Sequence, residues 1–455
     1  MDMLRRPLVR FARIDFAIAL SILVLALSLS FARPAHAMKI QEITSPGGIK
    51  AWLVEAHENP LLALRFSFEG GSAQDPEGKD GVANFLSAML DEGAGDITSS
   101  DFQEQMETLA MRMRYEDGKD AFYGNFQTLT ENRAESVKLL KLALTKPRFD
   151  PDAVERIRGQ LLANLVYSDR DPERVAAKEW YAVAFAGHPY GRPAQGTAET
   201  VKAVTRDDLE AFRKRTFAQN NLRVVAVGDI TAEDLGKLLD EVFGDLPKTA
   251  ELTSVPAATL AKGTEKWVEM KVPQSVAVFG LPAMPRKDPD FMAAFVLNQL
   301  IGGGGFASRL MEEVREKRGL AYSVYSYLQP FRHASIMSGG VATRADAIHQ
   351  SLEVIRKELK HVADEGPTAD EWENAKKYLI GSYPLRFDTN AKIASQLLGL
   401  LEDDFGPEYI ENRNKMIEAL TIEDAKRVAK RLLDTDGLII TVVGQPATAP
   451  ADTKG

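Results

Sequence analysis

The chain contains an internal repeat, and this repeat constrains the possible folds more than any other feature. Residues 203–228, AVTRDDLEAFRKRTFAQNNLRVVAVG, align without a gap on residues 419–444, ALTIEDAKRVAKRLLDTDGLIITVVG. In each copy a threonine, Thr205 or Thr421, precedes acidic residues at the start of a helical pattern, which predicts a capped helix. A short β-branched run that ends at glycine follows and predicts a buried strand. The repeat indicates that one structural unit occurs twice.

The beginnings of the two halves also correspond. Residues 61–78 and 275–289 each give an apolar run, then turn residues, then a helical pattern. Long amphipathic helices are predicted at 151–168 and 346–366, so each half mixes strands with helices. We therefore predict an α+β fold with two homologous αβ domains that arose by internal duplication.

Between the two copies of the repeat, residues 247–266 differ in composition from the sequence on either side. This stretch is rich in Pro, Thr, Ala and Ser and has no helical period, which predicts an extended linker. The domains are accordingly expected at 38–246 and 267–446, with a frayed tail at 447–455.

The first 37 residues have the pattern of a secretory signal peptide. A basic start precedes a 17-residue apolar run, and Ala35-His36-Ala37 is a small-x-small cleavage pattern. Cleavage is expected after Ala37, and the chain is expected in the periplasm. The alternative is an uncleaved membrane anchor, because the apolar run approaches the length that spans a bilayer.

Charge and cysteine content exclude several classes of function. Residues 1–37 contain five Arg and two Asp, so the rest of the chain falls from a net charge of −9 to −12. Such an acidic surface disfavours nucleic acid and anionic membranes as partners. The chain has no cysteine, which excludes disulfides, thiolate metal sites and cysteine nucleophiles.

The segment 81–93, GVANFLSAMLDEG, has two faces at helical spacing. Its apolar residues form one stripe that should be buried; they are Val82, Phe85, Leu86, Met89 and Leu90. The second face carries Asn84, Ser87, Ala88 and Asp91. In a metal-binding H-x-x-E-H helix, two histidines and a glutamate use this spacing to hold zinc and activate water.

The region around this helix, 69–94, resembles the zinc-helix region of the pitrilysin/insulinase family of inverted zinc metallopeptidases. The segments 188–197, HPYGRPAQGT, and 300–324, LIGGGGFASRLMEEVREKRGLAYSV, are also similar to that family. The likeness covers nearly the whole chain after residue 37 and is closest to two-domain chains of the mitochondrial-processing-peptidase type. It implies that each domain is a mostly antiparallel sheet covered by helices, in a clam-shell type of peptidase fold.

The chain departs from the family where the family binds zinc. By this resemblance, Asn84 and Ala88 occupy the two histidine positions and Ser87 occupies the position of the catalytic glutamate. The family's third ligand should fall near Ala163 and Asn164, which are not acidic. Zinc binds imidazole, thiolate or carboxylate groups, so we expect no metal in this chain and no peptide hydrolysis by the chain alone.

The second half retains residues that match other family features. Arg315 and Tyr322 are seven residues apart and match the family's Arg/Tyr pair, which implies that they bind substrate and stabilise the oxyanion. Without the resemblance, Arg315 would be a helix-surface charge and Tyr322 a core residue. The glycine stretch of Gly302, Gly303, Gly304 and Gly305 resembles the family's glycine-rich loop, which implies either a substrate loop or a structural turn.

These features predict a non-catalytic subunit of a heterodimeric zinc metallopeptidase. The partner would be a homologous chain with an H-x-x-E-H motif, which would carry the zinc, while this chain would supply Arg315 and Tyr322 for peptide substrates. Two alternatives remain open: a homodimeric peptide-binding or holdase protein, and a structural scaffold without peptidase activity.

Overall fold

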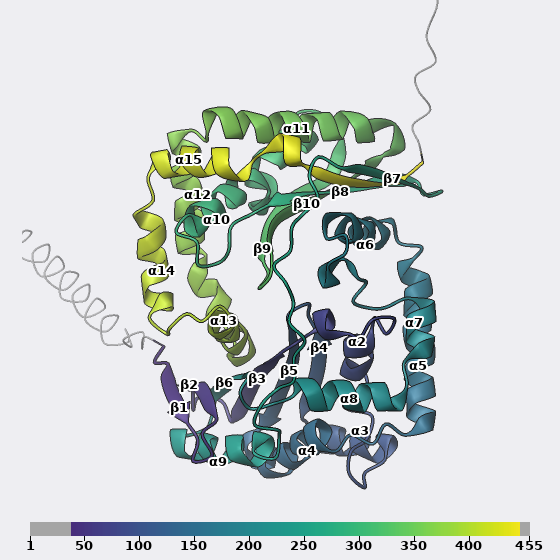
Figure 1. Cartoon of the computed structure of the whole chain (residues 1–455). Coiled ribbons are helices and arrows are strands. Elements are labelled where there is room, and N and C mark those ends of the chain that lie inside the picture. The colour runs from purple at the N-terminus through teal and green to yellow at the C-terminus, as the bar shows by residue number, and fades with distance from the viewer. Residues whose placement is uncertain (1–37, 446–455) are drawn as a thin grey trace, which may run out of the picture. The chain divides into compact units, whose positions relative to one another are not determined.

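The computed structural model describes residues 38–445, so the predicted signal peptide and tail lie outside the described residues (Figure 1). Each half builds one mixed sheet. The N-half sheet has the strand order β1-β2-β6-β3-β5-β4, and the C-half sheet has the order β7-β11-β8-β10-β9. The strands of the N-half are β1 (Gln41–Thr44), β2 (Lys50–Glu55), β3 (Leu61–Glu69), β4 (Arg112–Asp117), β5 (Ala121–Leu129) and β6 (Leu222–Gly228). Those of the C-half are β7 (Glu265–Glu269), β8 (Gln274–Pro282), β9 (Ala321–Pro330), β10 (Ser335–Arg344) and β11 (Ile439–Gly444).

The two sheets have the same topology apart from the additional strand β1. Strands β2 to β6 occupy the same places, in the same order along the chain, as β7 to β11. One pair in each sheet is parallel, β2 with β6 and β7 with β11, and the remaining pairs are antiparallel. The predicted α+β class with two homologous, mostly antiparallel units is therefore confirmed.

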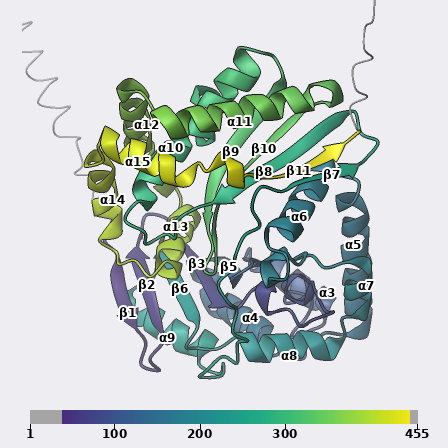
Figure 2. The same ribbon diagram turned by 45° about the horizontal axis from the view of Figure 1, so that its top comes forward.

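Helices cover both sheets, and each half has its own apolar core (Figure 2). The α-helices of the N-half are α2 (Val82–Ser87), α3 (Ser99–Thr108), α4 (Arg133–Thr145), α5 (Pro151–Ser168), α6 (Pro172–Ala184), α7 (Ala198–Ala203), α8 (Arg206–Thr216) and α9 (Ala232–Phe243). Those of the C-half are α10 (Phe291–Asn298), α11 (Ile348–Glu365), α12 (Ala369–Gly381), α13 (Asn390–Glu402), α14 (Tyr409–Glu418) and α15 (Ile422–Leu432). Thr205 and Thr421 cap α8 and α15 with complete capping boxes, as the repeat predicted.

The two halves exchange helices. Helix α6 of the N-half packs on β8 and β11 of the C-half sheet, and α13 of the C-half packs on β3 and β6 of the N-half sheet (Figure 1). Trp180 of α6 is fully buried, and its indole N–H donates to the Ile439 carbonyl at 3.1 Å. A methyl group at Gly280 of β8 would lie 2.4 Å from the Trp180 ring, so glycine is required for this close approach.

The stretch predicted as a linker runs without helix or strand from residue 247 to residue 264. It contacts both halves, because the Ala258 N–H donates to the His333 carbonyl and the Ala261 N–H donates to the Ala184 carbonyl. His188 accepts from the Tyr190 N–H, and its second ring nitrogen lies 2.9 Å from the Pro256 carbonyl oxygen. These contacts show that His188 helps to hold the linker in position.

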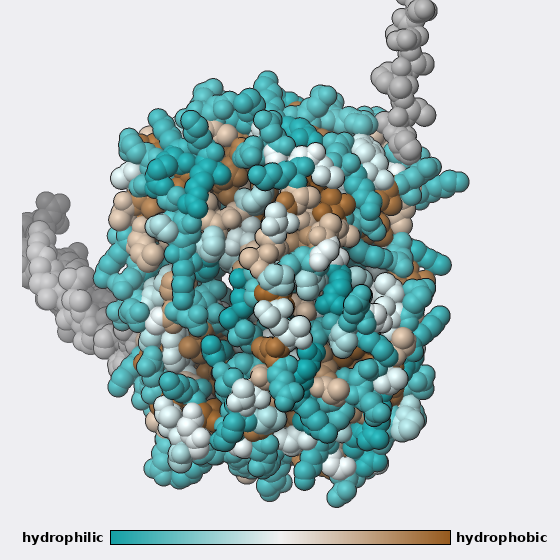
Figure 3. Space-filling view, in the orientation of Figure 1, coloured by the Kyte–Doolittle hydropathy of each residue, from teal (hydrophilic) through white to brown (hydrophobic). Residues whose placement is uncertain are grey.

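The surface seen in Figure 3 is mainly hydrophilic, with apolar residues scattered between polar ones. Within residues 38–445, no helix combines the length and the apolar character that crossing a lipid bilayer requires.

The exchange of helices predicts a large effect of Trp180 on stability. Trp180→Ala should lower the free energy of unfolding by about 3–5 kcal/mol, because it leaves a cavity under the C-half sheet. Chemical denaturation measures the loss. Trp267, which is 36% exposed on β7, is the matched control, and Trp267→Ala should cost about 1 kcal/mol or less. Similar losses in the two variants would contradict the role of Trp180.

Candidate functional site

Helix α2 is held in place by the apolar stripe that the sequence predicted. Val82, Phe85, Leu86, Met89 and Leu90 are all fully buried. The regular helix ends at Ser87, earlier than the sequence pattern suggested, and tighter turns follow. Asp91 consequently lies beyond the helix.

The start of α2 is fixed by the side chain of Asp75. Its two carboxylate oxygens accept from the backbone N–H groups of Gly81 and Ala83 at 2.8 and 2.9 Å. Burial raises the pKa of Asp75 to about 7 in spite of these two bonds. The carboxylate satisfies backbone donors that the first helical turn leaves unpaired.

The second face of α2 carries Asn84, Ser87 and Ala88, for which the resemblance predicted two ligand positions and the position of the catalytic base. The Asn84 amide donates to Asp117 of β4 at 2.8 Å, and the Ser87 hydroxyl donates to the Asn84 carbonyl at 2.7 Å. Ala88 contributes only a half-buried methyl group. Burial raises the pKa of Asp117, and the bond from Asn84 opposes this shift.

No carboxylate occupies the position on α5 where the resemblance predicted the third ligand. Ala163 and Asn164 of α5 are both exposed. Helix α5 packs against α2 elsewhere, where the Arg158 guanidinium lies 5.2 Å from the centre of the Phe85 ring.

These residues do not fit a zinc ion. An amide, a hydroxyl and a methyl group replace the expected ligands and base, and the carboxylate of Asp117 accepts a hydrogen bond from Asn84. Among residues 38–445, no group of three or more His, Cys, Asp or Glu side chains is arranged to hold a metal. No catalytic step through a metal of this chain can be derived from this donor set.

We call the face of α2 that carries Asn84, Ser87 and Ala88 the degenerate face. A cavity of about 600 Å³ lies beside it. Its wall includes Asp117 at the end of β4, Lys119 in the turn that follows, Tyr181 of α6, and Phe331 after β9. The Lys119 ammonium donates to the Tyr190 carbonyl at 2.7 Å and lies 4.5 Å from the centre of the Tyr181 ring. Burial lowers the pKa of Lys119 to about 8. This cavity could not be predicted from the sequence because its wall combines five separate segments that no motif connects.

Arg315 and Tyr322 meet in the C-half. The Arg315 guanidinium lies 5.2 Å from the centre of the Tyr322 ring and 4.5 Å from that of Phe306. Tyr322 is 79% exposed and Phe306 is 70% exposed, so Tyr322 is not a core residue. One guanidinium nitrogen, Nη1, is buried without a hydrogen-bond partner, and the ion pair of Arg315 with Glu316 is long, at 3.8 Å.

Irregular backbone surrounds this pair. Arg315 lies in a π-helical segment, Met311–Glu316, and Tyr322 is skipped where the β9–β10 pairing shifts register, since Ser323 pairs with Ala342 and Ala321 with Thr343. π-helical turns and β-bulges redirect side chains and occur frequently at functional sites. Tyr322 is accordingly exposed to solvent, and the half-buried Arg315 guanidinium lies beside its ring.

The glycine stretch lies next to this pair and has two parts. Gly302 and Gly303 end a second π-helical segment, Gln299–Gly303, and a methyl group at Gly302 would lie 2.4 Å from the Ser326 hydroxyl. Gly305 has φ +57° with open space around it, directly before Phe306. Gly302 is thus needed for close packing on β9, while Gly304 and Gly305 shape the approach to Phe306.

The structure therefore forms two separate groups from the predicted residues. Asn84, Ser87 and Ala88 share one face of α2, and Arg315 and Tyr322 share the cluster beside the glycine stretch. None of the recorded hydrogen bonds, ion pairs or ring contacts within residues 38–445 joins the two groups.

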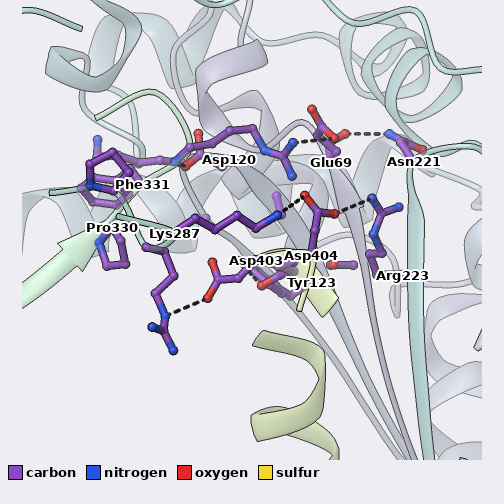
Figure 4. Close-up of a pocket in the computed structure, with 18 residues that line it drawn as sticks. Glu69, Asp120, Tyr123, Asn221, Arg223, Lys287, Pro330, Phe331, Asp403 and Asp404 are labelled. Atoms are coloured by element: carbon purple, nitrogen blue, oxygen red, sulfur yellow. Dashed lines mark hydrogen bonds and ion pairs between the residues drawn. The ribbon is translucent and has the colours of Figure 1, made fainter. Parts of the chain in front are cut away.

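A third feature is a charged pocket of about 440 Å³ between elements of both halves (Figure 4). Its acids and bases pair with one another. Arg332 lies 3.3 Å from Glu69, Lys287 lies 3.5 Å from Asp404, and Arg286 lies 3.3 Å from Asp403. Because these acidic and basic side chains neutralise one another, the pocket does not require a bound ion to balance its charge.

The sequence matches two family models. Residues 51–198 match the insulinase (peptidase family M16) model, and residues 203–379 match the peptidase M16 inactive domain. The chain belongs to the insulinase family.

Individual relatives in the M16 family agree with this placement. The non-peptidase homolog YmxG of Helicobacter pylori is 28% identical over 81% of this chain and 85% of the relative. An uncharacterized zinc protease of Streptomyces coelicolor is 27% identical over 87% of each chain. The crystal structure of a peptidase M16 inactive domain from Pseudomonas fluorescens superposes with a TM-score of 0.85 at 30% identity, covering 90% of this chain and 98% of that one.

The inactive-domain model matches residues 203–379, whereas α2 lies in the half that matches the insulinase model. The support for a chain that is inactive as a peptidase by itself comes from the donor set on α2, and the names of two relatives, a non-peptidase homolog and an M16 inactive domain, agree with it. The expected membership in the family is confirmed.

If the missing ligands are the reason that the chain binds no zinc, introducing histidines on α2 should create zinc binding. Asn84→His combined with Ala88→His should bind about one zinc per chain, because the two imidazoles would lie one helical turn apart beside Asp117. Zinc titration by calorimetry measures the uptake. The unchanged chain and a variant with only Ala88→His should take up no stoichiometric zinc. Zinc binding by the unchanged chain would contradict our account of this face.

Proposed function

We propose that this chain is the non-catalytic subunit of a heterodimeric zinc metallopeptidase in the periplasm. The partner would be a homologous M16 chain with an intact H-x-x-E-H helix, and the substrates would be peptides. The absence of a usable donor set on α2 supports a need for such a partner. The periplasmic location rests on the sequence of residues 1–37.

The observation that carries the proposal is the state of Arg315. Its guanidinium is placed between the rings of Phe306 and Tyr322, has an unpartnered Nη1 donor, and forms only a long ion pair. Leaving a buried donor without an acceptor costs free energy, so local packing alone does not favour this placement of Arg315. An arginine that only decorates a helix surface would have its donors in water.

The chemistry follows from these donors. Zinc in the partner would supply a polarised water for attack on the peptide carbonyl. The Arg315 guanidinium and the Tyr322 hydroxyl would donate to the substrate carbonyl oxygen, where negative charge develops, and would hold the peptide backbone in register. The exposed position of Tyr322 makes its hydroxyl accessible to a peptide that is bound mainly by the partner.

This proposal predicts a loss of turnover without a loss of assembly. In the complex with its partner, Arg315→Ala combined with Tyr322→Phe should lower kcat about 100-fold, the scale of removing an oxyanion donor. Steady-state peptide cleavage measures it. Arg318 belongs to the same basic run but pairs with Glu313, so Arg318→Ala is the matched control and should leave kcat unchanged. Unchanged turnover in the double variant would remove both residues from the mechanism.

One observation favours the second candidate, a homodimeric protein that binds peptides without cutting them. Among the strands of residues 38–445, β9 lies at the edge of its sheet and pairs with β10 alone. It carries Tyr322, Tyr325 and Tyr327, which are 79%, 47% and 40% exposed. Edge strands with exposed aromatic side chains can accept an extended peptide. A stable homodimer that binds unfolded peptides in the absence of a second chain would favour this candidate.

A further inference from the structure

A further pocket, which lies in the C-half, differs in its charges from the two pockets described above. It encloses about 320 Å³ between α10, β9, α13, α14 and the short 3₁₀ helix Tyr383–Phe387. In Figure 1, α10, α13 and α14 lie left of the middle of the molecule, and β9 runs nearer the middle. Its apolar wall is formed by residues such as Met292, Phe295, Leu328 and Leu400.

Three arginines line this pocket, which we call the arginine pocket, and no acidic residue among residues 38–445 belongs to its lining. Arg286 is compensated, because it lies 3.3 Å from Asp403 and donates to the Tyr409 hydroxyl at 2.6 Å. Arg413 and Arg386 are different. Within residues 38–445, no carboxylate lies at ion-pair distance from either guanidinium. This local excess of positive charge stands out in a chain whose net charge is −9.

Arg413 is the more informative of the two because it is only 4% exposed. Its Nη1 donates to the Leu379 carbonyl and to the Asn414 side chain, at 3.0 and 2.9 Å. Its guanidinium lies 4.1 Å from the centre of the Tyr383 ring and 5.6 Å from that of Phe295. Burial lowers the pKa of Arg413, as expected for a charge removed from water without a counter-ion. A buried charge of this kind is stabilised when an anion completes its pairing.

We propose that this pocket binds the free C-terminal carboxylate of a peptide whose last residue is large and apolar. The planar guanidiniums of Arg413 and Arg386 suit a carboxylate, which accepts two parallel N–H bonds. The aromatic and aliphatic wall suits the side chain of the terminal residue. The Gln396 amide on α13 is available to the last peptide group. This inference rests on the proposed peptide substrates and names the end of the peptide that the chain recognises.

Direct binding to the purified chain, without any partner, tests the proposal. The probes are acetyl-Ala-Ala-Phe with a free carboxylate, the same peptide as its C-terminal amide, and 3-phenylpropionate, which has the carboxylate and ring without peptide groups. Calorimetry should show that the free-acid peptide binds at least about tenfold more tightly than the amide, since a charge-assisted bond is lost. It should also bind more tightly than 3-phenylpropionate.

Variants assign the binding to this pocket. Arg386 is exposed, so Arg386→Gln should preserve the fold. It should lower the affinity for the free-acid peptide about tenfold and leave the affinity for the amide unchanged. Arg413→Lys, checked by thermal unfolding, should weaken it as well. Arg206→Gln, an exposed position on α8, is the matched control and should change nothing.

Two outcomes would overturn the proposal. Equal binding of the acid and the amide, or full binding by Arg386→Gln, would show that the pocket does not recognise a carboxylate. Equal binding of 3-phenylpropionate and the peptide would assign the pocket to small free acids instead of peptide ends. These outcomes are independent of the turnover experiment on Arg315 and Tyr322, because they require neither a partner nor zinc.

Discussion

The reciprocal exchange of α6 and α13 is the contact on which the rest of the structure depends. Each sheet is completed on one face by a helix from the other half, and Trp180 joins α6 to β8 and β11 through its indole and through the space left at Gly280. Both helices also build the pockets. Tyr181 of α6 lines the cavity beside the degenerate face, and Leu400 of α13 lines the arginine pocket. A disturbance of either helix would therefore change the candidate sites of both halves.

In helix α2, the residues that hold the fold are different from the residues at the predicted metal-ligand positions. Its buried stripe and the two bonds from Asp75 fix its position. The face with Asn84, Ser87 and Ala88 contributes little to that core, so a change of residue there removes metal ligands at small cost in stability. The Arg315 cluster has the opposite character, because an unpartnered donor, a π-helical turn and a skipped strand residue are costly features. Such features are retained at functional sites.

Much of this architecture could be predicted from the sequence because the signals were local. The repeat predicted two equivalent units, Thr205 and Thr421 predicted helix starts, and the apolar stripe of 81–93 predicted a buried helix. The missing ligands could be predicted because the resemblance to the family assigns its ligand and base positions to one short helix, at Asn84, Ser87 and Ala88. The exchange of helices, the skipped position of Tyr322 and the arginine pocket could not be predicted. They depend on contacts between residues far apart in the chain, such as Arg413 with Tyr383 and Phe295, which leave no periodic pattern.

The measurement that tests the central claim most directly is a gentle affinity purification of the tagged chain from its own cells, with zinc and peptidase activity assayed on the same sample. Our account predicts a second chain of similar size, about one zinc per pair and cleavage that a chelator abolishes. The chain purified away from this partner should hold no zinc and cleave no peptide. Zinc and activity in the lone chain would contradict the account, and a lone, metal-free chain with no partner would exclude the heterodimer.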